Sequence, residues 1–175
     1  LDLVEKELVT DQMVLTVGYD IENLTNKKIR QAYKGEITKD SYGRLVPKPA
    51  HGRINLQRHT SSTKLILEAA MELFDRIVDQ NLLVRKINIT ANHLVDEASV
   101  QESDSFEQLD FFSDYKAKHA RRKHEEAELE RERKAQKAAL AIKKKFGKNA
   151  ILKGMNLVEG ATSIERNRQI GGHKA

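Results

Sequence analysis

Hydrophobic and polar side chains alternate along three segments of the chain, which predicts three β-strands. These segments are residues 13–19, 53–59 and 84–92. Between the second and third strands, residues 65–78 place apolar side chains at every third or fourth position, as in an amphipathic helix. Residues 4–9 are expected to be the last turns of an earlier helix. This order of strands and helices predicts a small α+β fold in which helices cover one face of a sheet.

The polar side of the second and third predicted strands is rich in hydrogen-bond donors and has no acidic residue. Its members are Arg53, Asn55 and Gln57 on the second strand and Lys86, Asn88, Thr90 and Asn92 on the third. A sheet that is covered on one side normally exposes its other side to water, so polarity alone does not indicate a ligand.

The charge of the chain is unevenly distributed. Its 175 residues carry a net charge of +5, from 31 Lys and Arg against 26 Asp and Glu. Residues 27–64 hold ten basic and two acidic side chains, and residues 137–153 hold six lysines and no acid. Such basic patches are typical of phosphate binding, although a solvated surface gives the same count. Next to the polar strands, the first patch favours a platform for nucleic acid.

Composition divides the chain into four regions. Residues 1–95 contain the predicted sheet and helix, with a long polar loop over residues 20–52, and loops of this length are usually functional or mobile. Residues 96–114 are predicted to be an acidic linker, residues 115–147 a charged helix, and residues 148–175 a basic, flexible tail. The charged helix has no sustained apolar heptad, so a coiled coil is the weaker interpretation.

Catalytic and metal-binding patterns are absent from the sequence. There is no cysteine, the six histidines lack the spacing of metal ligands, and no glycine-rich phosphate loop follows a predicted strand. No apolar run has the length of a membrane span, and the N-terminus lacks the features of a signal peptide and an initiator Met. We therefore expect a soluble, cytoplasmic protein without a membrane partner, and a chain that is a fragment.

One short apolar motif lies in the polar linker. Gln108, Leu109, Asp110, Phe111 and Phe112 have no local core to fill, and exposed apolar anchors in such a segment are typical of a docking peptide. The pentapeptide resembles the Gln-Leu-x-Leu-Phe motif by which bacterial DNA-processing proteins bind the sliding clamp, with a Phe in place of the second Leu. The alternative is a hydrophobic staple that folds back on the domain.

Several longer segments resemble the C-terminal part of Y-family translesion DNA polymerases of the UmuC/DinB type. The resemblance is carried by residues 13–20, 49–52 and 73–78. The tail segments 146–156 and 165–175 are similar to the ends of the Gram-positive UmuC-like branch.

This resemblance implies a little-finger domain, a β-α-β-β-α-β unit whose sheet grips damaged or primer-template DNA, here without its first strand. It implies that the catalytic palm, with two Mg²⁺ ions, lies upstream, so that the parent is a DNA-directed DNA polymerase while this fragment has no catalytic residue and no cofactor of its own. The parent would act in DNA repair and the SOS response, in association with the nucleoid.

Two sets of site residues follow from the resemblance. The DNA-binding set is Arg53, Asn55, Gln57, Arg58, Lys64, Lys86, Asn88 and Thr90. The clamp-binding set is Gln108, Leu109, Phe111 and Phe112. Lys and Arg at alternating positions of a strand project to the same side, as contacts to a phosphate backbone require.

Two other functions agree with the composition. In the first, the chain is a non-catalytic protein-interaction adaptor whose charged helix docks a partner, and it has no affinity for DNA. In the second, it is a ribosome-binding or RNA-binding protein, which would prefer RNA to DNA. A titration with primer-template DNA and RNA separates these hypotheses.

Overall fold

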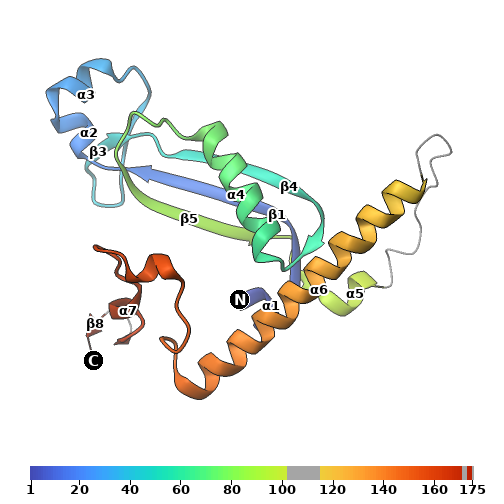
Figure 1. The fold of residues 1–175 in the computed structure, drawn as a ribbon. Coiled ribbons are helices and arrows are strands. Elements are labelled where there is room, and N and C mark those ends of the chain that lie inside the picture. Colours follow the sequence, from blue (N-terminus) through green and yellow to red (C-terminus); the bar gives the residue numbers. More distant parts are fainter. Residues whose placement is uncertain (102–114, 171–172, 175) are drawn as a thin grey trace. The chain divides into compact units, whose positions relative to one another are not determined.

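The computed structural model describes residues 1–101, 115–170 and 173–174 (Figure 1). They form two compact units. One lies within Glu7–Glu107, and the other combines Leu1–Lys6 with residues of Gln108–Ala175. The predicted α+β class is confirmed, since the first unit contains an antiparallel sheet with a helix packed on it and the second contains a long helix.

The first unit is built around strand β1 (Leu8–Tyr19), which lies between its two main partners. Strand β4 (Ala50–Thr60) and strand β5 (Val84–Asn92) flank β1, and both pairings are antiparallel. The short strand β6 (Val95–Asp96) pairs with the start of β1. Helix α4 (Thr63–Ile77) packs on β4 and β1.

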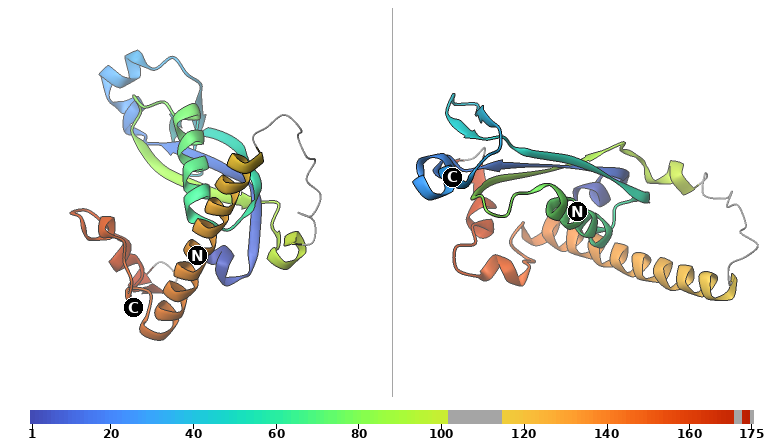
Figure 2. Two further views of the ribbon diagram at one scale, coloured as in Figure 1. Left: turned by 45° about the vertical axis from the view of Figure 1, so that its right-hand side comes forward. Right: turned by 90° about the horizontal axis from the view of Figure 1, so that it is seen from above.

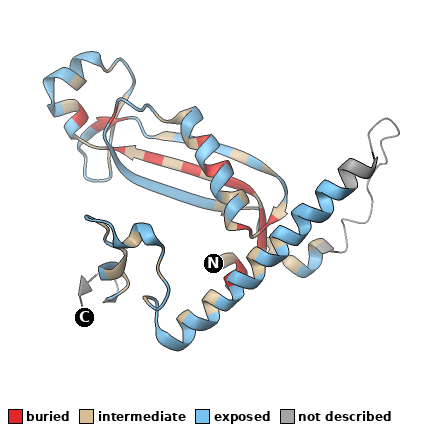
Figure 3. Cartoon of the chain, viewed as in Figure 1, coloured by how far each residue is buried: buried red, intermediate tan, exposed pale blue. Residues whose placement is uncertain are grey.

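The alternation of β1 decides which face of the sheet is buried. Met13, Leu15, Val17 and Tyr19 are buried, while the residues between them are only half-buried (Figure 3). Leu15 and Val17 form the centre of the core with Leu73 of α4, and all three are at most 2% exposed. This side of β1 therefore faces α4.

Helix α4 begins where the sequence predicts and comes close to β4 at Gly52. The Ser62 side chain caps the helix by accepting a hydrogen bond from the Leu65 N–H at 3.2 Å. A Cβ atom on Gly52 would lie 3.0 Å from Leu73 Cδ1 and 3.1 Å from Ile77 Cγ2. Glycine at this position thus lets the helix pack tightly on the strand.

Two details of the predicted elements differ from the structure. The expected helix over residues 4–9 ends earlier, because α1 covers only Asp2–Glu5 and β1 begins at Leu8. Pairing of Val9 with Val95 of β6 makes this segment a strand. In addition, residues of the predicted linker form the short helix α5 (Glu97–Gln101).

The long loop between β1 and β4 contains ordered elements, and we call residues 20–48 the excursion. It contains helix α2 (Glu22–Thr25), helix α3 (Lys27–Ala32), strand β2 (Ile37–Lys39) and strand β3 (Leu45–Pro47). Strands β2 and β3 form an antiparallel hairpin, and α2 packs on α3 and β3. The excursion is therefore a small folded element rather than an irregular loop.

A buried asparagine attaches the excursion to the sheet. The Asn23 side chain is fully buried, and its Nδ2 donates to the backbone oxygens of Asp20 and Leu83, each at 2.9 Å. Its Oδ1 accepts from the Leu83 N–H at 2.8 Å. Asp20 adds a 2.9 Å ion pair with Arg85. The hydrogen bond from the Glu22 N–H and the one from Arg85 lower the pKa of Asp20, so this pair is ionised at neutral pH.

The second unit contains the predicted charged helix, α6 (Tyr115–Phe146), with α1 packed against it. Lys144 Nζ pairs with Glu5 Oε1 at 3.1 Å. The chain continues through the 3-10 helix η1 (Gly154–Leu157), helix α7 (Ser163–Arg166), strand β7 (Gln169–Ile170) and strand β8 (His173–Lys174). Asn149 connects two parts of this tail, since it donates to the Ile164 carbonyl and accepts from the Asn167 amide. None of the described helices has the length and apolar composition that crossing a membrane requires.

The role of Asn23 can be tested by substitution. We expect Asn23→Ala to lower the free energy of unfolding by about 2 kcal/mol, because the partly buried Leu83 N–H loses its acceptor. Urea denaturation measures this change. The matched control is Asn88→Ala, on an exposed side chain, which should change stability by less than about 0.5 kcal/mol. Equal losses in the two variants would show that Asn23 has no special anchoring role.

Candidate nucleic-acid interface

The face of the sheet opposite α4, which we call the open face, carries three rows of side chains across the strands. Residues paired in adjacent antiparallel strands project to the same side. The rows are Asn55–Gln12–Asn92, Arg53–Val14–Thr90 and His51–Thr16–Asn88, and Lys86 lies opposite Gly18 beyond them. Five residues of the predicted DNA-binding set thus lie on one face: Arg53, Asn55, Lys86, Asn88 and Thr90.

Hydrogen bonds between side chains hold the first row in place. Gln12 Nε2 donates to Asn55 Oδ1 at 2.8 Å, and Asn92 Nδ2 donates to Gln12 Oε1 at 3.2 Å. Gln12 is 7% exposed, so it lies below its more exposed neighbours and orients both of their amides. In the third row, Thr16 Oγ1 lies 2.9 Å from His51 Nδ1. The open face is consequently preorganised by short polar contacts.

The open face has positive charge without an acidic side chain in its rows. Arg53 on β4 and Lys86 on β5 are both exposed. They lie two strands apart and four β1 residues apart, which corresponds to a separation on the order of 15 Å. Two cations at this distance are too far apart to contact the same phosphate.

Three predicted DNA-binding residues are placed differently. Gln57 and Arg58 lie on β4 beyond Asn55, where the regular pairing with β1 is interrupted, and both are exposed. The interruption ends the strict alternation of this strand, so their directions do not follow from the rows. Lys64 lies on α4, the helix that packs against the other face. The predicted clamp-binding residues Gln108, Leu109, Phe111 and Phe112 lie outside the described residues.

The contribution of β1 to this face was not predicted from the sequence. Gln12 and Thr16 of β1 lie between the two predicted polar strands, and His51 of β4 contacts Thr16, although none of the three was expected to belong to the site. The alternation of β1 contained the signal for Thr16. Gln12 was missed because the strand was predicted to begin at residue 13.

Metal binding is not indicated in the part of the chain that the structure describes, where no group of three His, Asp or Glu side chains has suitable geometry. At one end of the sheet Asp11 has two histidine neighbours. Its Oδ1 lies 2.9 Å from His93 Nδ1, and its Oδ2 lies 3.8 Å from His59 Nε2.

Comparison with known protein families shows a match over residues 2–111, to the model of a family described as the impB/mucB/samB family C-terminal domain. The match covers more than half of the chain and includes the whole sheet and α4. No curated protein and no solved structure matches the chain.

The amide row gives a testable prediction. We expect Gln12→Ala to lower the free energy of unfolding by about 1–2 kcal/mol, because two hydrogen bonds are lost and a buried cavity is left. The side-chain amide resonances of Asn55 and Asn92 should shift in NMR spectra of the same variant. Gln57→Ala, at an exposed position of β4, is the control and should move neither quantity. Unchanged Asn55 and Asn92 resonances in Gln12→Ala would refute the row.

Proposed function

The chain belongs to the impB/mucB/samB family through its C-terminal domain, the C-terminal part of UmuC/DinB-type Y-family DNA polymerases, and from this premise we propose that the open face binds primer-template DNA. The observation that carries the proposal is the common exposure of Arg53, Lys86 and the amides and hydroxyls between them on one acid-free face. In this proposal the domain is the little finger of a translesion polymerase of the Gram-positive UmuC-like branch, which acts in DNA repair and the SOS response.

The chemistry of the open face suits the DNA backbone rather than the bases. Arg53 and Lys86 supply charge for two separate phosphates, and Asn88 and Thr90 supply neutral donors between them. Contacts to phosphate and sugar position a protein on DNA without reading its sequence. A polymerase that copies any template requires this indifference to sequence.

Preorganisation favours such binding. Because Gln12 already fixes the amides of Asn55 and Asn92, these side chains lose little conformational freedom when DNA arrives. The pairing of β1 with both neighbours likewise fixes the spacing of Arg53 and Lys86. The open face therefore acts as a rigid support that holds the duplex.

Nucleotidyl transfer is assigned in this proposal to a palm domain outside the present chain, which would hold two Mg²⁺ ions. The present chain would contribute the grip on the DNA as the parent enzyme extends a primer past a damaged template base. Association with the nucleoid would follow from that grip.

We further propose that Gln108, Leu109, Phe111 and Phe112 attach the polymerase to the sliding clamp. The support is the sequence motif, in which one polar and three apolar side chains stand in a polar segment. The segment follows the sheet-containing part of the chain, so it would link DNA gripping to a factor that encircles DNA.

The DNA-binding proposal predicts a change in salt dependence. We expect the double variant Arg53→Glu/Lys86→Glu to bind duplex DNA more weakly, with the slope of log K against log salt concentration reduced in magnitude by about 2, since two phosphate contacts are lost. Fluorescence anisotropy with a primer-template at several salt concentrations measures both quantities.

The comparison variant is Lys64→Glu, a single charge reversal at a residue that was predicted to bind DNA but lies on α4, the helix that packs against the other face. It should leave the slope within about 0.5 of the unaltered chain. Equal slopes for the double variant and the unaltered chain would reject the open face as the DNA-binding surface. Clamp binding by a chain that has no affinity for DNA would instead support the adaptor function, and preference for RNA would support the RNA-binding one.

The clamp proposal predicts loss of binding when the anchors are truncated. We expect Gln108→Ala/Phe112→Ala to abolish capture of the chain by an immobilised bacterial sliding clamp, because removing anchor side chains from a docking peptide typically costs about 2 kcal/mol or more. Asp110→Ala changes the variable position of the motif and should retain capture. Undiminished capture of the double variant would remove this site from the proposal.

A further inference from the structure

The tip of the β2–β3 hairpin presents an aromatic ring to solvent. Tyr42 is 81% exposed, whereas Tyr19 is buried and Tyr33 is half-buried. A single exposed aromatic residue is ordinary by itself. The surroundings of this ring make it a candidate binding site.

Asp40 fixes the turn that carries the ring. Its Oδ1 accepts hydrogen bonds from the backbone N–H groups of Tyr42 and Arg44, each at 2.9 Å. The Gly43 N–H donates to the Asp40 carbonyl at 3.0 Å, and the Arg44 carbonyl accepts from the Asp40 N–H at 2.9 Å. Gly43 has a φ of +77°, which a residue with a side chain adopts only with strain. The turn therefore holds Tyr42 in a defined position.

Arg44 lies over the ring of Tyr42. Its guanidinium carbon is 5.0 Å from the ring centroid, a cation–π geometry. Asp40 Oδ2 holds the same guanidinium through Nε at 2.8 Å and through a second nitrogen at 2.7 Å. The hydrogen bond from Arg44 lowers the pKa of Asp40, so the pair stays ionised at neutral pH. Arg44 thus supports the ring, while most of the Tyr42 surface remains open.

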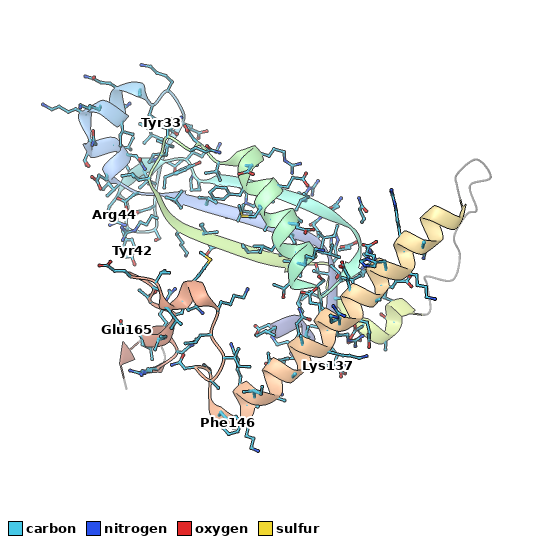
Figure 4. The ribbon with its side chains drawn as sticks, viewed as in Figure 1. Tyr33, Tyr42, Arg44, Lys137, Phe146 and Glu165 are labelled. Carbon is cyan, nitrogen blue, oxygen red and sulfur yellow. The ribbon has the colours of Figure 1, made fainter. Side chains whose placement is uncertain are left out.

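The hairpin projects on the same side of the sheet as the open face. Seen from above, α4 lies on one side of the sheet and the β2–β3 hairpin rises on the other (Figure 2, right). Tyr42 and Arg44 lie together in the excursion, at the end of the sheet where β1 finishes (Figure 4). DNA that lies along the open face would therefore extend toward the ring.

The excursion also carries positive charge that is not neutralised within it. Five basic side chains make no ion pair with any residue that the structure describes: Lys27, Lys28, Arg30, Lys34 and Lys39. Its acids are mostly occupied, since Glu36 pairs with Lys48 at 2.7 Å and Asp40 pairs with Arg44. The excursion thus combines an exposed ring with unpaired cations in one small element, and single-stranded nucleic acid is bound by such a combination through base stacking and phosphate contacts.

From these observations we propose that Tyr42, supported by Arg44, stacks on an unpaired base of single-stranded DNA, and that the lysines of the excursion neutralise its phosphates. The bases of a duplex already stack on one another, so an unpaired base gains most from the ring. The inference rests on the proposed DNA binding for its ligand, but it uses residues that the open face does not contain. The single strand would be the template segment that continues beyond the primer.

The test compares three DNA ligands by fluorescence anisotropy with the full chain: an oligothymidylate of about 12 nucleotides, a primer-template with an overhang and a blunt duplex. We expect Tyr42→Ala to bind the first two about 5- to 160-fold more weakly, because stacking of one base on an aromatic side chain contributes about 1–3 kcal/mol. Affinity for the blunt duplex should change less than about twofold. Tyr42→Phe retains the ring and should resemble the unaltered chain.

A fluorescent reporter gives an independent measurement. The chain contains no tryptophan, so Tyr42→Trp introduces a single reporter at the proposed site. Its emission should be quenched by the oligothymidylate and should be unaffected by the blunt duplex. The proposal is overturned if Tyr42→Ala binds the oligothymidylate normally, if Tyr42→Phe loses as much affinity as Tyr42→Ala, or if an acidic peptide quenches the reporter while the oligothymidylate does not. Loss of duplex binding in Arg53→Glu/Lys86→Glu with normal single-strand binding in Tyr42→Ala would retain the open face and reject this inference alone.

Discussion

The register of β1 between β4 and β5 is the constraint on which the rest of the first unit depends. Side chains on a strand alternate between the two faces, so Leu15 and Val17 reach the core only if Thr16 and Gln12 face away from α4. A shift of one residue would turn these polar groups toward α4 and the aliphatic ones toward the open face. The same pairing places the β4 and β5 side chains of the open face opposite one another. Core packing and the candidate interface are therefore two results of one register.

The excursion depends on a second constraint, which is polar. The amide of Asn23 makes three hydrogen bonds to the backbone of Asp20 and Leu83, and an apolar side chain of the same size cannot replace it. Hydrogen bonds are directional, so they fix the orientation of α2 more strictly than apolar contacts would. Because α2 packs on β3, this orientation extends to the hairpin and its exposed tyrosine. A buried asparagine in this way positions a surface residue that it does not touch.

Periodic patterns explain why much of the sheet could be predicted. The alternation of β4 and β5 and the helical spacing of α4 are local features, and five of the eight predicted DNA-binding residues lie together on the open face. The excursion could not be predicted in detail, since α2 has four residues and α3 has six, too few for a recognisable period. The predicted start of β1 was wrong, because the strand begins where it pairs with β6, about 85 residues further along the chain. This error removed Gln12 from the expected site. Likewise, the irregular pairing beyond Asn55 has no signature in the alternation of β4.

The two proposed contacts with DNA differ in their physical basis. Binding at Arg53 and Lys86 releases counterions from the phosphates, so it weakens steeply as salt concentration rises. Stacking on Tyr42 displaces water from a flat apolar surface and depends far less on salt. Arg44 is already neutralised by Asp40, so its support of the ring does not compete with the phosphates for charge. Rising salt should therefore weaken the phosphate contacts of the open face and those of the excursion lysines alike, while the stacking of a base on Tyr42 is the part of the binding that salt weakens least.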